Sequence, residues 1–69
     1  MARGWVRWFD VRKGFGFIAV DGGGPDVFVV YTELVGEGFR TLEEGQWVEF
    51  DVREAKSGPE AVGVRLARR

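Results

Sequence analysis

Short hydrophobic runs alternate with glycine-rich segments along this chain, and none of them has the 3.6-residue period of an amphipathic helix. β-Branched and aromatic residues, which favour strands, dominate the runs. The pattern predicts five strands, at residues 4–9, 15–20, 26–31, 46–53 and 60–66. Residues 21–25 carry the turn chemistry of a hairpin. We therefore expect the second and third strands to be adjacent.

The segments between the strands are short, apart from one. Residues 32–35 predict a single helical turn with Thr32 as its N-cap. Residues 36–45 form a longer connection, which we expect Phe39 and Leu42 to hold in place. Five short strands with glycine-rich turns are typical of a sandwich or barrel, and closing the sheet removes its exposed edges. The predicted fold is an all-β, five-stranded antiparallel barrel of the oligonucleotide/oligosaccharide-binding (OB) type, a single domain at residues 1–69.

Aromatic and aliphatic side chains alternate on the second and third predicted strands, so each kind falls on its own face. The rings on one face are Phe15, Phe17 and Phe28, and the aliphatic side chains on the other are Ile18, Val20, Val27 and Val29. Aliphatic side chains fill a tight barrel better, and Gly16 on that face permits strong coiling of the strand. We therefore predict an exposed patch of three rings, the kind of surface that usually marks a binding site. The alternative is that the rings are half-buried under residues 36–45 as ordinary core.

Composition and charge then narrow the classes of function. The chain has no Cys and no His, which excludes disulfides and the usual zinc sites, and it contains no plausible catalytic triad. We predict no enzymatic activity, no cofactor and no small-molecule substrate. The net charge of −1 is not that of a protein that binds nucleic acid mainly through phosphates. Binding to nucleic acid would therefore depend on the aromatic rings.

The sequence contains no apolar run of about 20 residues and no apolar run directly after residues 1–4. It therefore predicts neither a membrane span nor a signal peptide. We expect a cytoplasmic protein.

A nucleic-acid-binding motif lies across the second predicted strand. The motif is Lys13-Gly14-Phe15-Gly16-Phe17-Ile18. It has the order basic, glycine, aromatic, glycine, aromatic, aliphatic. This is an RNP1-type pattern. An RNP2-like element follows at Val27-Phe28-Val29-Val30-Tyr31. The RNA-recognition motif has these elements in the reverse order and needs two helices, whereas the cold-shock domain has this order.

The chain resembles the cold-shock domain family from residue 4 to about residue 66. Besides the RNP-type elements, the resemblance rests on Trp8-Phe9-Asp10, Asp26-Val27-Phe28-Val29, the connection 36–46 (GEGFRTLEEGQ) and Gly58-Pro59-Glu60-Ala61. It implies a barrel that binds single-stranded RNA and DNA with low sequence selectivity, and a role as RNA chaperone, transcription antiterminator or cold-shock regulator. The family's binding positions fall here on Arg7, Trp8, Phe9, Asp10, Lys13, Phe15, Phe17, Phe28, Val30, Tyr31 and Phe39, with Lys56 and Pro59 from the loop 56–59.

Three positions depart from the family's pattern. Val30 stands where the family usually has His, Asp10 where it has Asn, and Glu60 where it has Gln. The first change removes a stacking side chain and the other two add negative charge, so all three predict weaker binding. The alternative function is therefore that of an attenuated paralogue or variant whose aromatic patch serves protein interaction or self-association.

The first and fourth predicted strands add two further rings. Trp5 and Trp47 alternate with Val6 and Val48, so both are expected on the outer face, where they would form a cross-strand pair. A surface for self-association and two merely half-buried rings are the alternatives, and we expect a monomer. On the first strand, the resemblance places the neighbours Arg7 and Trp8 in one groove, which requires a bulge or a strong bend.

Overall fold

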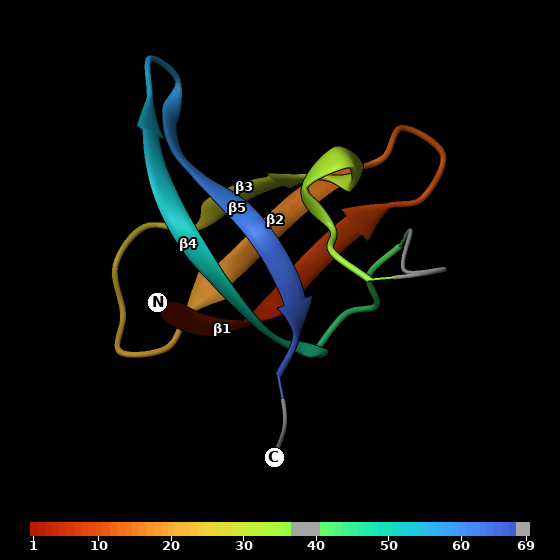
Figure 1. Ribbon diagram of the computed structural model, residues 1–69, viewed down its shortest axis with the longest axis horizontal. Helices are drawn as coiled ribbons and strands as arrows, with labels where there is room; N and C mark the ends of the chain where they lie inside the picture. Colours follow the sequence, from red (N-terminus) through yellow and green to blue (C-terminus); the bar gives the residue numbers. More distant parts are fainter. Residues whose placement is uncertain (37–40, 68–69) are drawn as a thin grey trace.

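Five strands close into a barrel in the computed structural model, which describes residues 1–36 and 41–67 (Figure 1). They are β1 (Ala2–Asp10), β2 (Phe15–Val20), β3 (Val27–Val30), β4 (Trp47–Ala55) and β5 (Gly58–Leu66). The predicted all-β barrel is confirmed. The bounds of β2 are those predicted, and the ends of the other strands differ from the prediction by one or two residues at most.

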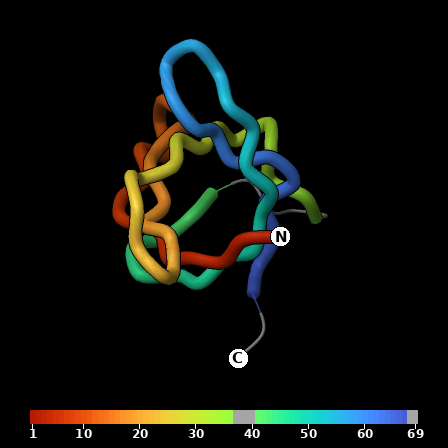
Figure 2. The backbone as a smooth tube through the Cα atoms, turned by 90° about the vertical axis from the view of Figure 1, so that its left-hand side faces the viewer, coloured from red at the N-terminus to blue at the C-terminus, as the bar shows by residue number. Residues whose placement is uncertain are grey.

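The order of strands around the barrel is β1-β2-β3-β5-β4. Four of the neighbouring pairs are antiparallel, whereas β3 and β5, which close the barrel, run parallel where Phe28 pairs with Glu60. A parallel pair needs a long connection, and the chain between these two strands supplies one because it includes the whole of β4. Seen from the side, the β4–β5 hairpin extends beyond the rest of the barrel (Figure 2).

Aliphatic side chains fill the barrel interior, with one buried ring among them. The buried cluster consists of Val6, Ile18, Val27, Val29, Leu42, Val48, Phe50, Ala61 and Val64. The predicted inward face of β2 and β3 is thereby confirmed, and Val20 packs against this cluster while remaining partly exposed. Leu42 anchors the connection 36–45 in the core, as predicted. Phe39, the other expected anchor, lies outside the described residues.

A bulge in β1 sets which side chains of this strand face outward. Val6 pairs with Ile18 of β2, but the next pair is Trp8 with Phe17, so Arg7 is an extra residue on the β1 side. An extra residue shifts the alternation of the strand. Val6 is buried, and both Arg7 and Trp8 are exposed. The irregularity that the sequence required is therefore present, and it places a cation and a ring side by side.

One 3₁₀ turn follows β3, at Tyr31–Glu33. The predicted N-cap role of Thr32 is wrong, because Val30 occupies that position and no side chain caps the turn. The N-cap thus lies two residues earlier than expected, and the backbone N–H of Tyr31 donates to the carbonyl oxygen of Gly14 at 2.8 Å at the start of the turn. In the described part of the chain, no helix is long and apolar enough to cross a membrane.

Candidate nucleic-acid interface

Four aromatic rings from three neighbouring strands lie against one another on the outside of the barrel. We call Trp8, Phe15, Phe17 and Phe28 the ring cluster. Trp8 lies 6.0 Å from Phe15 and 5.6 Å from Phe17, and Phe28 lies 5.8 Å from Phe15 and 5.7 Å from Phe17, all measured between ring centroids. These separations, with tilted or edge-to-face planes, are those that aromatic pairs prefer. Each ring is thus held by two others.

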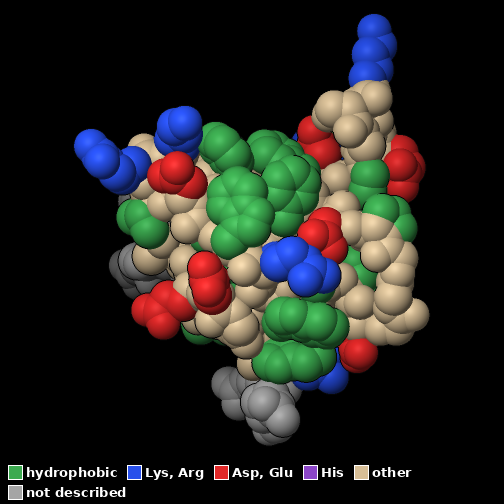
Figure 3. All heavy atoms as spheres, turned by 180° about the vertical axis from the view of Figure 1, so that it is seen from behind, with side chains coloured by type: hydrophobic (Ala, Val, Ile, Leu, Met, Phe, Trp, Pro, Cys, Tyr) green, Lys and Arg blue, Asp and Glu red, His purple; other side chains and the backbone are tan. Residues whose placement is uncertain are grey.

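The ring cluster is open to solvent. Trp8 is 38% exposed, and Phe15, Phe17 and Phe28 are half-buried. None of the four belongs to the aliphatic core, and Leu42, the buried residue of the connection 36–45, packs in that core instead. The predicted outward placement of the three phenylalanines is therefore confirmed. In the space-filling view of the far side of the barrel, hydrophobic side chains gather in two groups with basic and acidic side chains between them (Figure 3).

Gly16 lies on the inner side of β2, behind the ring cluster. A Cβ atom at this position would lie 2.1 Å from the carbonyl oxygen of Trp8 and 2.7 Å from the Cα of Phe9. Only glycine allows β1 and β2 to approach this closely. Phe9, the ladder partner of Gly16, packs against the core, so the structure does not bring this predicted binding residue into the ring cluster.

Tyr31 and Val30 border the ring cluster at the end of β3. Val30 is half-buried and pairs with Phe15 in the ladder, which places it next to that ring. Tyr31 is 48% exposed, and its ring covers Gly14, where a Cβ would lie 2.6 Å from the ring carbon Cδ1. The glycine also has a φ of 80°, so two independent constraints require glycine here. Tyr31 therefore extends the aromatic surface toward the β1–β2 turn.

Asp10 stabilises the β1–β2 turn through one carboxylate oxygen. Oδ1 accepts hydrogen bonds from the backbone N–H groups of Arg12 and Lys13, each at 2.9 Å, and Gly14 donates to the Asp10 carbonyl oxygen at 2.7 Å. An asparagine side-chain oxygen can accept the same two bonds, so the turn does not by itself require the negative charge. The Lys13 side chain at this turn is exposed.

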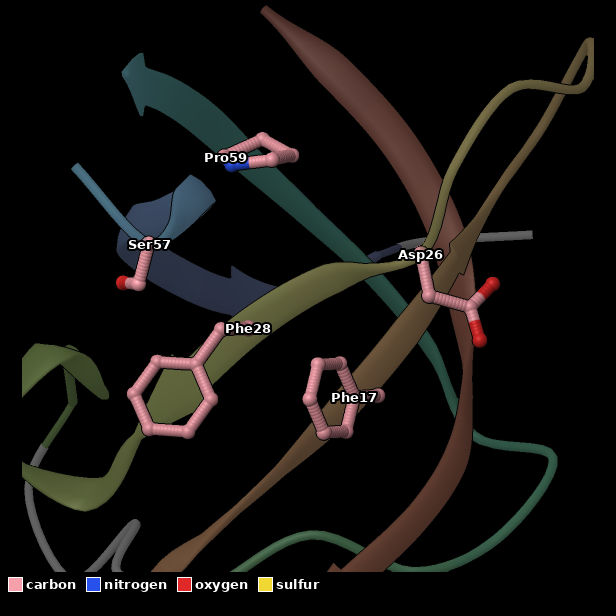
Figure 4. Close-up of a pocket in the computed structure, with 5 residues that line it drawn as sticks. All are labelled: Phe17, Asp26, Phe28, Ser57 and Pro59. Atoms are coloured by element: carbon pink, nitrogen blue, oxygen red, sulfur yellow. The ribbon is translucent and has the colours of Figure 1, made fainter. Parts of the chain in front are cut away.

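The ring cluster continues into a hollow lined by Phe17, Asp26, Phe28, Ser57 and Pro59 (Figure 4). Its volume is about 260 Å³. This is smaller than the roughly 300–1,000 Å³ of an enclosed ligand pocket, and the planes of Phe17 and Phe28 are inclined at 68°. The hollow therefore suits a flat group lying against one of the two rings. The structure brings the predicted residue Pro59 to this site, whereas Lys56 lies exposed at the end of the projecting hairpin. Ser57 belongs to the loop 56–59 that the resemblance places at the groove, whereas sequence reasoning missed Asp26 as a lining residue.

A bidentate ion pair lies beside this hollow. Arg7 donates from Nε to Asp26 Oδ2 at 2.7 Å and from Nη2 to Oδ1 at 3.2 Å. Paired hydrogen bonds of this kind fix the guanidinium in one orientation. Both side chains remain partly exposed, so the pair contributes only about 0–1 kcal/mol to stability. Its effect on the site is to balance the charge of Arg7 next to the rings.

Glu60, one of the three departures from the family's pattern, is also paired. It lies opposite Arg53 in the β4–β5 ladder, and Arg53 Nη2 donates to Glu60 Oε1 at 3.0 Å. The added negative charge is therefore balanced by a neighbouring strand. Phe39 is the remaining predicted binding residue, and it lies outside the described residues.

The fold and the site define a small OB-fold protein of the nucleic-acid-binding class. A family model described as the 'Cold-shock' DNA-binding domain matches residues 2–67. The chain belongs to the cold-shock domain family and is a bacterial cold-shock protein.

Known relatives cover nearly the whole chain. Probable cold shock protein A of Mycolicibacterium smegmatis is 60% identical over 65 residues, which cover 94% of this chain and 97% of the relative. Cold shock protein CspB of Bacillus caldolyticus is 55% identical over 64 residues, covering 93% and 96% respectively. A solved structure of Drosophila Unr CSD456 matches with a TM-score of 0.80 and 22% identity, over 97% of this chain and 26% of that one. The last likeness concerns the fold alone.

Proposed function

We propose that this protein binds single-stranded RNA and DNA with low sequence selectivity, by stacking unpaired bases on the ring cluster. The observation that carries the proposal is the set of four mutually supported rings on the outer face of the barrel. Every base has a π-face, so a stacking surface accepts all four bases. Low selectivity follows from this geometry.

The expected affinity follows from the number of rings. A base stacked on an aromatic side chain contributes about 1–3 kcal/mol. The four rings and Tyr31 at their border therefore supply about 5–15 kcal/mol if each holds a base, and part of this offsets the ordering of the strand. The roughly 8 kcal/mol of a micromolar complex lies within this range. Submicromolar binding is consistent with this sum.

Phosphate contacts play the smaller part. Arg7 is held by Asp26, and Arg12 and Lys13 are exposed cations at the turn before Phe15. Since the whole chain carries a net charge of −1, no general attraction draws a polyanion to it. Stacking accounts for most of the binding energy, and the cations orient the strand.

The biological role that we propose is that of an RNA chaperone and transcription antiterminator acting on cytoplasmic transcripts. A protein that binds only the unpaired form shifts the folding equilibrium of an RNA toward that form by mass action. The shift needs no ATP and no catalytic group. It needs only a preference for single strands over duplexes.

That preference is the direct test. We expect a short oligo-dT of about 6 nucleotides to bind with submicromolar affinity. A duplex long enough to stay fully paired during the titration should bind at least about 10-fold more weakly, because paired bases are already stacked and hide their faces. Tryptophan fluorescence titration measures both. Equal affinity for the two forms would remove the proposal.

Val30 gives a second prediction, because it lies next to Phe15 where the family usually has a stacking His. We expect Val30→His to tighten oligo-dT binding about 5-fold or more, the equivalent of roughly 1 kcal/mol from one added stacking ring. Val52→His, at an exposed valine on β4, serves as the control and should leave affinity unchanged. If both variants bind like the parent chain, position 30 is not a base subsite.

A further inference from the structure

A second aromatic surface lies on the outside of the barrel, over β1 and β4. Trp5 and Trp47 are direct partners in the ladder, and their ring centroids are 5.3 Å apart with planes inclined at 51°. The predicted cross-strand pair is thus confirmed. Both rings are half-buried, whereas the adjacent Val6 and Val48 are fully buried. We call Trp5 and Trp47 the tryptophan pair.

Basic residues alternate with aromatic ones along the outer face of β1. Arg3, Trp5 and Arg7 share that face by strand alternation, and the bulge returns Trp8 to it. The Arg3 guanidinium carbon lies 5.8 Å from the centroid of the Trp47 ring, over that ring. With a rise of about 3.3 Å per residue, Trp5 lies roughly 10 Å along the strand from Trp8. The tryptophan pair therefore continues the line of the ring cluster.

We propose that the tryptophan pair is an additional stacking subsite for a nucleic-acid strand that is already bound to the ring cluster. This inference rests on the proposed function and extends it along β1. Successive aromatic platforms along one strand, with Arg3 and Arg7 beside them, resemble the stacking surfaces that bind single-stranded nucleic acid, although each arginine is paired with a carboxylate. Arg3 pairs with Glu49 at 3.8 Å, and the two side chains are 45% and 30% exposed, so the pair is a weak surface contact and exchanging the carboxylate for a phosphate costs little.

The size of the surface favours a strand over a second copy of this chain. A stable interface buries about 800 Å² on each partner, roughly a sixth of this protein's 4678 Å² of accessible surface. Two indoles bury at most about 150–250 Å² each, and these two are already half-buried in the monomer. Charged side chains, Arg3, Glu49 and Arg7, flank them. A stacked base needs only one flat contact, which the pair offers.

The test compares oligonucleotides of two lengths, both within the range of about 4–16 nucleotides that one OB fold covers. We expect affinity to rise about 10-fold or more from an oligo-dT of about 6 nucleotides to one of about 12. The variant Trp5→Thr/Trp47→Thr should lose most of this gain and keep the affinity for the short form. A long form whose added nucleotides are abasic should give the parent chain little gain, because it supplies phosphates without bases.

The outcomes separate the two proposals. If neither the parent chain nor the double variant binds the short oligo-dT, the proposed function fails. If the short form binds and the double variant keeps the whole gain, or the abasic extension gives it, only the tryptophan subsite fails. The surface would be assigned to self-association, and the subsite overturned, if the parent chain and the double variant gain the same affinity from the longer oligo-dT while only the parent chain sediments in a concentration-dependent way.

If the double variant does not fold, a second measurement tests the subsite without it. The chain has three tryptophans, so Trp8→Phe leaves Trp5 and Trp47 as its only indole fluorophores. We expect their fluorescence to be quenched by the long oligo-dT and not by the short one. Quenching that is the same for both lengths, or absent with both, contradicts the subsite.

Discussion

A variant in which Phe15 and Phe28 are both replaced by alanine is expected to bind a short oligo-dT at least about 30-fold more weakly than the parent chain. The two rings come from adjacent strands and lie 5.8 Å apart. Each stacked base contributes about 1–3 kcal/mol, so losing two platforms removes at least about 2 kcal/mol. Trp8 contacts Phe15 and Phe17 contacts Phe28, so each of the two remaining rings also loses one of its two ring neighbours.

The barrel itself should survive this change. Both rings are half-buried and neither belongs to the core cluster, so the far-ultraviolet circular dichroism and the thermal transition should remain cooperative. Val35→Ala/Leu66→Ala is the matched control, because it removes two exposed hydrophobic side chains outside the ring cluster. We expect the control to bind like the parent chain. Affinity within about 3-fold of the parent in the folded phenylalanine variant would show that the bases stack elsewhere.

The placement of the ring cluster was predictable because of a packing constraint. On β2 and β3 one face carries only aliphatic side chains and glycine, and a barrel this narrow has room for that face alone inside. Once the aliphatic face of β2 and β3 is assigned to the barrel interior, the phenylalanine rings on the opposite face must lie outside. The same reasoning gave the tryptophan pair, since Val6 and Val48 are the inward neighbours of Trp5 and Trp47.

The sequence did not predict which charges neutralise one another. Arg7 and Asp26 are 19 residues apart, and they meet because the pairing of β1, β2 and β3 brings the outward-facing Arg7 beside the start of β3. Arg53 and Glu60 meet because the β4–β5 register places them opposite each other. Register and bulges depend on the whole barrel, whereas alternation is local. The contacts of Asp10 are local instead. Its side chain accepts from the backbone N–H groups of residues two and three positions later, a turn pattern that the sequence itself carries.

Close approach of β1 and β2 at Gly16 leads to the prediction with the largest effect on stability. Gly16→Ala is expected to lower the free energy of unfolding by at least about 3 kcal/mol, because the new Cβ would lie 2.1 Å from the carbonyl oxygen of Trp8. The obstacle is backbone, which cannot rotate away as a flexible side chain can. For a domain of this size the change corresponds to a fall in melting temperature of about 12 °C or more.

The matched control is Gly23→Ala in the β2–β3 connection. Gly23 has a φ of 98° and no atom within 4 Å of its built Cβ, so the substitution costs only the roughly 1–2 kcal/mol of a left-handed alanine. Comparing the destabilisation by the two substitutions separates the effect of steric contact from that of backbone strain. Urea or thermal unfolding measures both values. Equal destabilisation by the two substitutions would mean that β1 and β2 can separate freely at Gly16. The bulge that places Trp8 on the outer face beside Arg7 adjoins this contact. Gly16→Ala should therefore also weaken oligo-dT binding in the fraction that remains folded, whereas Gly23→Ala should not.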